Sequence, residues 1–294
     1  MEQEKVVNKG EIKKKENKKG TIFGFSIWRI LAYFIIYSFI GYVIETLYGM
    51  ATKGVWESRQ SFLYGPFCGI YGLGAVVMII FLQYFNQNNN RLFIGGFIIG
   101  SIVEYIVSWY GEIVLHVKWW DYSNMPLNIN GRICVFFSIF WGLLAIYLMS
   151  YVNPKIDKLI DFIKSKISQK GLKILTALVT IFLFLDCVIT GYAIEMFLVR
   201  KVHEYNLPVA QKEEVEKRYE EVYQDEGLTQ LIYHFFGDEK MIKTFPNLKT
   251  QDAEGNMIYF DCYVGDIKPY YYKFESNGRG DLVKVLKHED REGE

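Results

Sequence analysis

Five long apolar segments constrain this chain more than any other feature of its sequence. Each is close to the ~20 residues that an α-helix needs to cross ~30 Å of hydrocarbon. A backbone in lipid must satisfy its hydrogen bonds internally, so such segments are expected to be helical. The sequence therefore predicts an all-α membrane protein with about five transmembrane helices in a bundle. The segments are residues 25–50, 65–85, 92–116, 132–152 and 172–199.

The residues on either side of these segments are polar and charged. Residues 1–24 begin with a Lys-rich stretch that is too polar to form a core, so we expect a basic, disordered N-terminal arm. Residues 25–200 hold the bundle, and residues 201–294 are expected to form a small soluble α+β module. The module is predicted to contain helices at 211–224 and 228–244 and short strands around 257–264, 270–275 and 282–286.

The distribution of Lys and Arg predicts the orientation, because basic loops remain on the cytoplasmic side. The N-terminal arm, residues 86–91 and residues 153–171 are basic, whereas residues 51–64 and 117–131 carry few cations. We therefore expect a cytoplasmic N-terminus and, after five spans, an extracytoplasmic C-terminal module. One re-entrant segment would reverse the side of the module.

We expect any such irregularity in residues 61–75, since they are apolar but rich in glycine. In a helix, Gly65, Gly69 and Gly72 would share one face. Pro66 suits a first turn, where its missing N–H removes no bond. We therefore expect a helix that begins near Pro66 and has a bare face. Such a face allows either close helix packing or close approach of a ligand.

Three acidic residues fall inside the predicted spans, where an unpaired charge is costly. Glu45, Glu104 and Asp186 each share a helical face with small residues. Two interpretations follow. The acids line a polar cavity that opens outward, or they lie neutralised in a tightly packed bundle. Arg132, at the outer level, is the expected counter-ion for one of the acids there.

A polar segment precedes the fourth span. Its Trp and Tyr side chains are typical of an interfacial aromatic belt. Asp121, Asn128 and Arg132 add hydrogen-bond donors and acceptors at the expected mouth of the bundle. Gly131 allows a tight turn into the span.

Three segments resemble a known family. They are SFLYGPFCGIYGLGA (61–75), WWDYSNMPLNINGRICVFFSIFWG (119–142) and FLFLDCVITGYA (182–193). In this order they resemble the putative ABC-transporter type IV permease family of bacterial membrane proteins, over roughly residues 27–200. The resemblance implies a multi-pass protein of the bacterial cytoplasmic membrane and a permease of unknown substrate. The positions it carries over are Gly65, Pro66, Tyr71, Gly72, Asp121, Tyr122, Asn128, Gly131 and Arg132.

Motifs for other activities are missing from the sequence. It has no GxxxxGK[ST], so an ATPase would be a separate subunit. Residues 153–171 have apolar residues at helical spacing, which suits docking of such a partner or a position on the anionic inner leaflet. We expect no catalytic, cofactor or metal site and no nucleic-acid partner. The partners expected are the lipid bilayer and a separate ATPase subunit or other membrane protein.

Three functions remain open on the sequence. The first is a permease subunit with an outward-facing polar pocket lined by acids. The second is a membrane sensor or scaffold that binds a partner through its C-terminal module. The third is a membrane enzyme that acts on a lipid-linked substrate.

Overall fold

The computed structural model describes residues 21–85 and 88–274. Among these residues, four helices are long and apolar enough to cross a membrane, and one shorter apolar helix accompanies them. The chain is therefore an all-α membrane protein, as predicted, with four long spans and a fifth, shorter helix. These helices are α2 (Ile27–Lys53), α3 (Gly69–Leu82), α4 (Asn89–Val114), the continuous Val135–Lys166 helix and α7 (Gln169–Tyr205).

Local sequence signals explain where these helices begin and end. The Ser26 side chain accepts a hydrogen bond from the Arg29 N–H at the start of α2, and Asn88 does the same for the Arg91 N–H at the start of α4. Gly54 ends α2 in the left-handed conformation, with a φ of 64°.

The shorter helix α3 begins at Gly69, and the expectation of a start near Pro66 is wrong. Gly65 has a φ of 81°, a conformation that costs glycine little. The Phe67 N–H then donates to the Gly65 carbonyl at 3.0 Å, which closes a turn before the helix begins. Gly65 and Pro66 therefore lie in a non-helical segment, residues 57–68.

The segment 57–68 and α3 together run along the length of α2. The Cys68 N–H donates to the carbonyl of Ser38, near the middle of α2, at 2.8 Å. A Cβ placed on Gly72 would meet the Phe34 carbonyl at 2.6 Å, so α3 packs closely on the first half of α2. Irregular backbone at this depth is tolerated where protein surrounds it or where it lines a cavity.

Small residues also bring α4 and α5 (Val135–Tyr147) together. A Cβ on Gly96 would lie 2.9 Å from the Trp141 carbonyl, and a Cβ on Gly100 would lie 2.5 Å from the Trp141 Cβ. The glycine pair in α4 therefore allows a close approach that larger residues would prevent.

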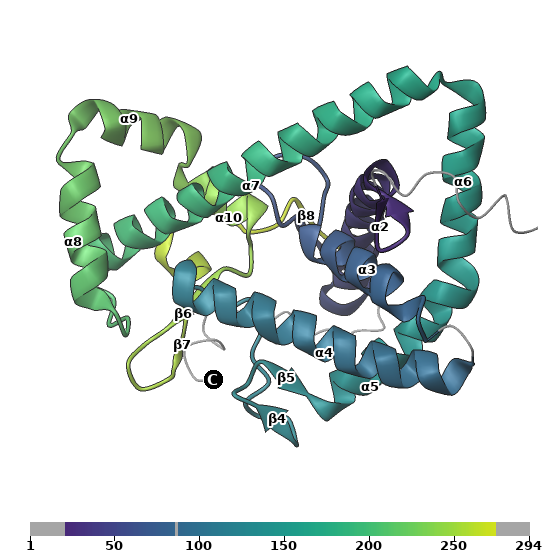
Figure 1. The fold of residues 1–294 in the computed structure, drawn as a ribbon. Helices are drawn as coiled ribbons and strands as arrows, with labels where there is room; N and C mark the ends of the chain where they lie inside the picture. Colours follow the sequence, from purple (N-terminus) through teal and green to yellow (C-terminus); the bar gives the residue numbers. More distant parts are fainter. Residues whose placement is uncertain (1–20, 86–87, 275–294) are drawn as a thin grey trace, which may run out of the picture.

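Beyond α5 the helix continues through the π-helical turn η2 (Leu148–Val152) into α6 (Asn153–Lys166). Figure 1 shows α6 joining the end of α5 to the start of α7. Ile156 and Ile160 of α6 are buried in the core of the bundle, and Arg29 of α2 pairs with Asp157 at 2.8 Å. The helical spacing noted in residues 153–171 thus corresponds to an amphipathic helix at the end of the bundle where α2 begins.

The C-terminal residues gather around the far end of α7 (Figure 1). The helix predicted at 211–224 is confirmed as α8, whereas the stretch 228–244 forms two helices, separated at Phe236 and Gly237. The elements here are α8 (Lys212–Tyr223), α9 (Glu226–Phe235), α10 (Asp238–Thr244), β6 (Lys249–Gln251), β7 (Met257–Tyr259) and the 3-10 helix η3 (Phe260–Tyr263).

The strands of this region pair in two places. β6 and β7 form an antiparallel hairpin in which Thr250 lies opposite Ile258. β8 (Tyr272–Lys273), within the strand predicted at 270–275, pairs instead with β3 (Val55–Trp56), directly after α2. The strand predicted at 282–286 lies outside the described residues.

Two further hairpins complete the fold. β1 (Thr21–Ile22) pairs with β2 (Phe25–Ser26) before α2, and β4 (Asn128–Ile129) pairs with β5 (Ile133–Cys134) before α5.

One hydrophobic core joins the C-terminal region to the bundle. Phe197 and Val202 of α7 pack with Met241 and Phe260, and the same cluster includes Leu63 and Val117 from the loops of the bundle. α7 therefore belongs to both regions, and the C-terminal residues are held against the loops at one end of the bundle.

Candidate functional site

A cavity of about 340 Å³ lies inside the bundle, between α2, α3, α4 and α5. Trp120 and Tyr122, from the loop between α4 and α5, line it, as do Leu148 and Val152 of η2. Its walls are mainly aliphatic and aromatic. Glu45 and Glu104 are the acidic residues among the described residues that line it, and no Lys, Arg or His is among them.

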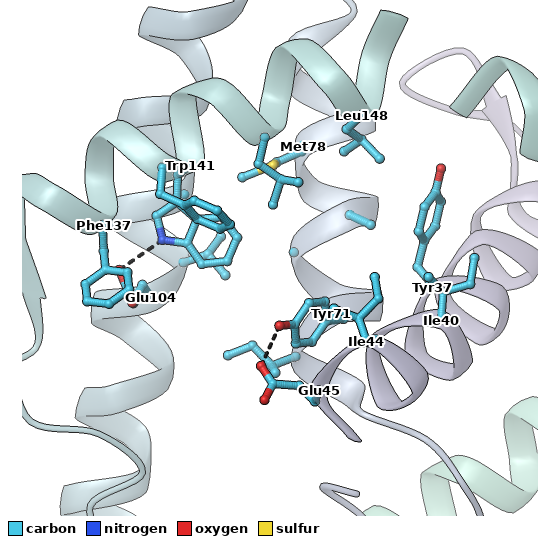
Figure 2. A pocket seen from close by; sticks show the side chains of 18 of the residues that line it. Tyr37, Ile40, Ile44, Glu45, Tyr71, Met78, Glu104, Phe137, Trp141 and Leu148 are labelled. Atoms are coloured by element: carbon cyan, nitrogen blue, oxygen red, sulfur yellow. Dashed lines mark hydrogen bonds between the residues drawn. The ribbon is translucent and has the colours of Figure 1, made fainter. Parts of the chain in front are cut away.

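Glu104 lies in one wall of the cavity and is 5% exposed. Its Oε1 accepts a hydrogen bond from the Tyr122 hydroxyl at 2.9 Å, and its Oε2 accepts one from the Trp141 indole N–H at 3.0 Å. An indole N–H can only donate, so Oε2 acts as an acceptor. Figure 2 shows the second bond, with the Trp141 ring against the cavity.

Glu45 enters the cavity from α2, at a separate place from Glu104 (Figure 2). The Tyr71 hydroxyl donates to Glu45 Oε1 at 2.5 Å. A Cβ on Gly41 would overlap the Tyr71 side chain, so the absence of a side chain at Gly41 makes room for this ring. The structure thus brings together four of the residues singled out from the sequence: Glu45, Tyr71, Glu104 and Tyr122.

The third acid, Asp186, lies elsewhere, against the irregular segment 57–68. It is 2% exposed, and its carboxylate accepts hydrogen bonds from the Tyr64 N–H at 3.1 and 3.2 Å. Thr190, one turn further along α7, accepts the Leu63 N–H at 2.7 Å. Asp186 therefore satisfies backbone groups of a segment that has no helical partners of its own.

The glycines and proline of residues 61–75 also serve this segment. Gly65 and Pro66 form its turn, and Gly72 faces α2 where the two helices pack closely. These three residues are not among those that line the cavity.

Asp121, Asn128 and Arg132 hold the loop that carries Tyr122. Asn128 accepts the Gly131 N–H at 3.0 Å, and the Trp120 indole donates to the Arg132 carbonyl at 3.0 Å. Arg132 pairs with Glu112 at 2.6 Å. These contacts fix the aromatic side chains that the loop presents to the cavity.

Asp121 is tied to its own loop. Its carboxylate accepts hydrogen bonds from the Ser123 N–H and hydroxyl at 3.1 and 2.6 Å, and Lys118 lies 3.6 Å away. Burial raises the pKa of Asp121, but the Ser123 hydrogen bonds and the Lys118 charge outweigh it and hold the pKa below its usual value. Asp121 is therefore a structural anion of the loop.

Sequence reasoning missed part of the cavity wall. The rings of Tyr37, Phe137, Phe140 and Trp141 form part of the wall. Gly74 also lines the cavity, and a Cβ placed on it would meet no atom within 4 Å. Aromatic residues in apolar segments are common at membrane interfaces, so their presence alone does not indicate that they face a cavity. Within residues 21–85 and 88–274, no group of three or more His, Cys, Asp or Glu side chains is arranged to hold a metal ion.

Comparison with known proteins gives one match. The family model described as "Putative ABC-transporter type IV" matches residues 32–191, more than half of the chain. The match includes every residue that lines the cavity and ends before α8. No curated protein and no solved structure matches this chain.

Proposed function

Because this chain belongs to the putative ABC-transporter type IV family, we propose that it is the permease subunit of a transporter and that the cavity between α2 and α5 is its substrate site. Membership of a transporter-type family favours this function over a catalytic one. The observation that carries the proposal is the cavity itself. Its volume of about 340 Å³ falls in the range of small-molecule sites, which combine apolar walls with a few placed polar groups.

The non-helical segment 57–68, which precedes the short helix α3, supports the same proposal. Binding sites in secondary transporters are often built at discontinuous helices, where irregular backbone adjoins a polar pathway. Here the segment 57–68 leads into α3, and Ile70 and Tyr71, in the first turn of α3, line the cavity.

We propose that the cavity opens toward the extracytoplasmic side of the bacterial cytoplasmic membrane. The loop that presents Trp120 and Tyr122 also contacts the C-terminal region, since the Lys118 N–H donates to the Lys249 carbonyl at 3.0 Å. In this orientation the C-terminal region is extracytoplasmic and the N-terminal arm is cytoplasmic, as the basic residues favour.

The same orientation places α6 at the cytoplasmic surface. Its exposed face combines Lys155 and Lys158 with Leu159 and Phe162, a pattern that suits an anionic leaflet. The sequence has no GxxxxGK[ST], so ATP hydrolysis would come from a separate subunit bound at this surface.

Filling the cavity tests the proposal. A Cβ on Gly74 meets no atom within 4 Å, so Gly74→Leu places a side chain in the cavity without a backbone clash. The control is Leu73→Phe, which enlarges an adjacent side chain that is 43% exposed on the outside of the bundle. The readout is untargeted mass spectrometry of solutes in cells that express each form at equal levels.

We expect cells without the protein to differ from wild type in at least one solute. Gly74→Leu should reproduce that difference, and Leu73→Phe should match wild type. A Gly74→Leu profile identical to wild type, when the deletion differs, would remove the cavity from the transport path. Identical profiles with and without the protein would count against transport itself.

A further inference from the structure

We propose that the cavity binds a monovalent organic cation with an apolar body, such as a quaternary ammonium compound; this inference rests on the proposed function, because it names the class of substrate for that site. The charge of the lining, the aromatic walls and the size of the cavity all favour such a ligand.

The cavity is lined by two acidic residues and by no basic residue of the described chain. Glu104 has only neutral donors, Tyr122 and Trp141, and Glu45 has Tyr71. In the described part of the chain, neither carboxylate forms an ion pair, and four cations around the bundle pair with other acids. These pairs are Arg29–Asp157, Arg59–Glu57, Lys118–Asp121 and Arg132–Glu112.

A carboxylate at this depth rarely stands without a partner of opposite charge. Glu104 is nearly inaccessible, and both of its oxygens point at donors that carry no net charge. A cationic ligand in the cavity would supply the missing charge. An anionic ligand would instead meet two carboxylates in a medium of low dielectric constant, where repulsion is strong.

The walls suit an organic cation. Eight aromatic side chains line the cavity: Tyr37, Tyr71, Trp120, Tyr122, Phe137, Phe140, Trp141 and Tyr147. An aromatic face attracts a cation within ~6 Å of its centre, Trp most strongly, and cages of such rings recognise quaternary ammonium groups. Figure 2 shows Phe137 and Trp141 beside Glu104, and Tyr71 beside Glu45, so each carboxylate has a ring next to it.

The size and lining of the cavity do not suit a bare metal ion. Hard divalent cations require about six to eight oxygen ligands, whereas the acidic lining residues are two, on different helices. The space of about 340 Å³ is far larger than one ion and is bounded mostly by apolar groups. An apolar body with a single positive charge satisfies both the walls and the carboxylates.

Calorimetric titration of the full chain in lipid nanodiscs tests this inference. The probe is benzyltrimethylammonium, and its neutral counterpart, 2,2-dimethylpropylbenzene, has the same shape without the charge. Empty nanodiscs correct for partition into lipid. We expect the cation to bind at least about tenfold more tightly than the neutral compound, because a desolvated contact between a cation and an aromatic ring can by itself account for a difference of that size. Equal or tighter binding of the neutral compound would overturn the inference, because it would indicate that the acids are protonated or play no part in recognition.

Variants locate the binding. Glu104→Gln and Glu45→Gln keep a side chain of the same size that can form hydrogen bonds, but each removes one negative charge. We expect each to weaken cation binding at least about fivefold. The control, Glu221→Gln, removes one charge from an exposed position on α8 and should leave binding unchanged. Equal affinity in Glu104→Gln, Glu45→Gln and wild type would overturn the inference. If a variant fails to fold, the comparison of the two probes on wild type still decides.

The two proposals fail separately. Cation binding in nanodiscs without any solute difference in cells would retain the ligand class and reject transport. A solute difference that Gly74→Leu abolishes, for a neutral or anionic solute, would retain transport and reject the cation.

Discussion

Two buried carboxylates of the bundle, Glu104 and Asp186, meet different kinds of donor. Asp186 accepts backbone N–H bonds from a segment that lacks helical hydrogen bonds, and it is therefore part of the scaffold. Glu104 accepts side-chain bonds from Tyr122 and Trp141 and belongs to the lining of the cavity. Two carboxylates of similar burial thus have different surroundings: Asp186 holds the fold, and Glu104 borders the cavity.

Asp186→Ala is expected to lower the free energy of unfolding by about 1–3 kcal/mol, because it leaves the partly buried Tyr64 N–H without its acceptor. Thermal unfolding in detergent measures the change. Val188→Ala, which shortens a side chain that is 59% exposed on the same helix, is the control and should have a much smaller effect. An Asp186→Ala protein as stable as the control would show that Asp186 does not support the segment 57–68.

At the scale of helices, the apolar length of the segments was enough to locate α2, α4, α5 and α7. The start of α3 could not be predicted, because it depends on the positive φ of Gly65 and on a bond from Cys68 to the middle of α2. Both are set by tertiary packing. The stripes of small residues indicated which faces meet, but a stripe does not say which neighbour it meets.

The candidate site was predictable in part for the same reason. Glu45 and Glu104 lie on stripes that border the cavity, whereas the stripe of Asp186 meets the irregular segment. The sequence does not show which aromatic residues line the cavity, because other Phe, Tyr and Trp residues of the bundle are exposed on its outer surface.

The glycines of α3 and α4 should respond oppositely to one substitution. Gly96→Ala places a Cβ against Ala145 and the Trp141 carbonyl, and we expect a loss of about 1–3 kcal/mol. Gly74→Ala points into open space, and the helix should gain about 0.5–1 kcal/mol. Denaturant titration of both variants measures the difference. Equal effects would contradict the close α4–α5 packing.

At the scale of the whole molecule, α7 ties the two ends of the protein into one body. Its C-terminal half packs with the C-terminal region, and that region binds the loops of the bundle: Thr250 donates to the His116 carbonyl at 2.7 Å, and the Tyr271 N–H donates to the Trp56 carbonyl at 2.8 Å. α6 and the start of α2 lie together at the other end, where Arg29 pairs with Asp157.

The two ends should label from opposite sides of the membrane. In a Cys262→Ser background, Glu254→Cys in the exposed turn between β6 and β7 should react with an impermeant maleimide in intact cells. Lys166→Cys, at the exposed end of α6, should react only after permeabilisation. The reverse pattern would invert the proposed orientation, and labelling of both in intact cells would contradict it.

The cavity as a ligand site is the central claim, and binding of benzyltrimethylammonium to Gly74→Leu tests it most directly. This variant fills open space that no other atom occupies within 4 Å of the new Cβ, so it should fold as wild type does. Calorimetry in nanodiscs should show binding to wild type and to Leu73→Phe, and an affinity at least about tenfold lower for Gly74→Leu. Unchanged affinity in a folded Gly74→Leu protein would contradict the account.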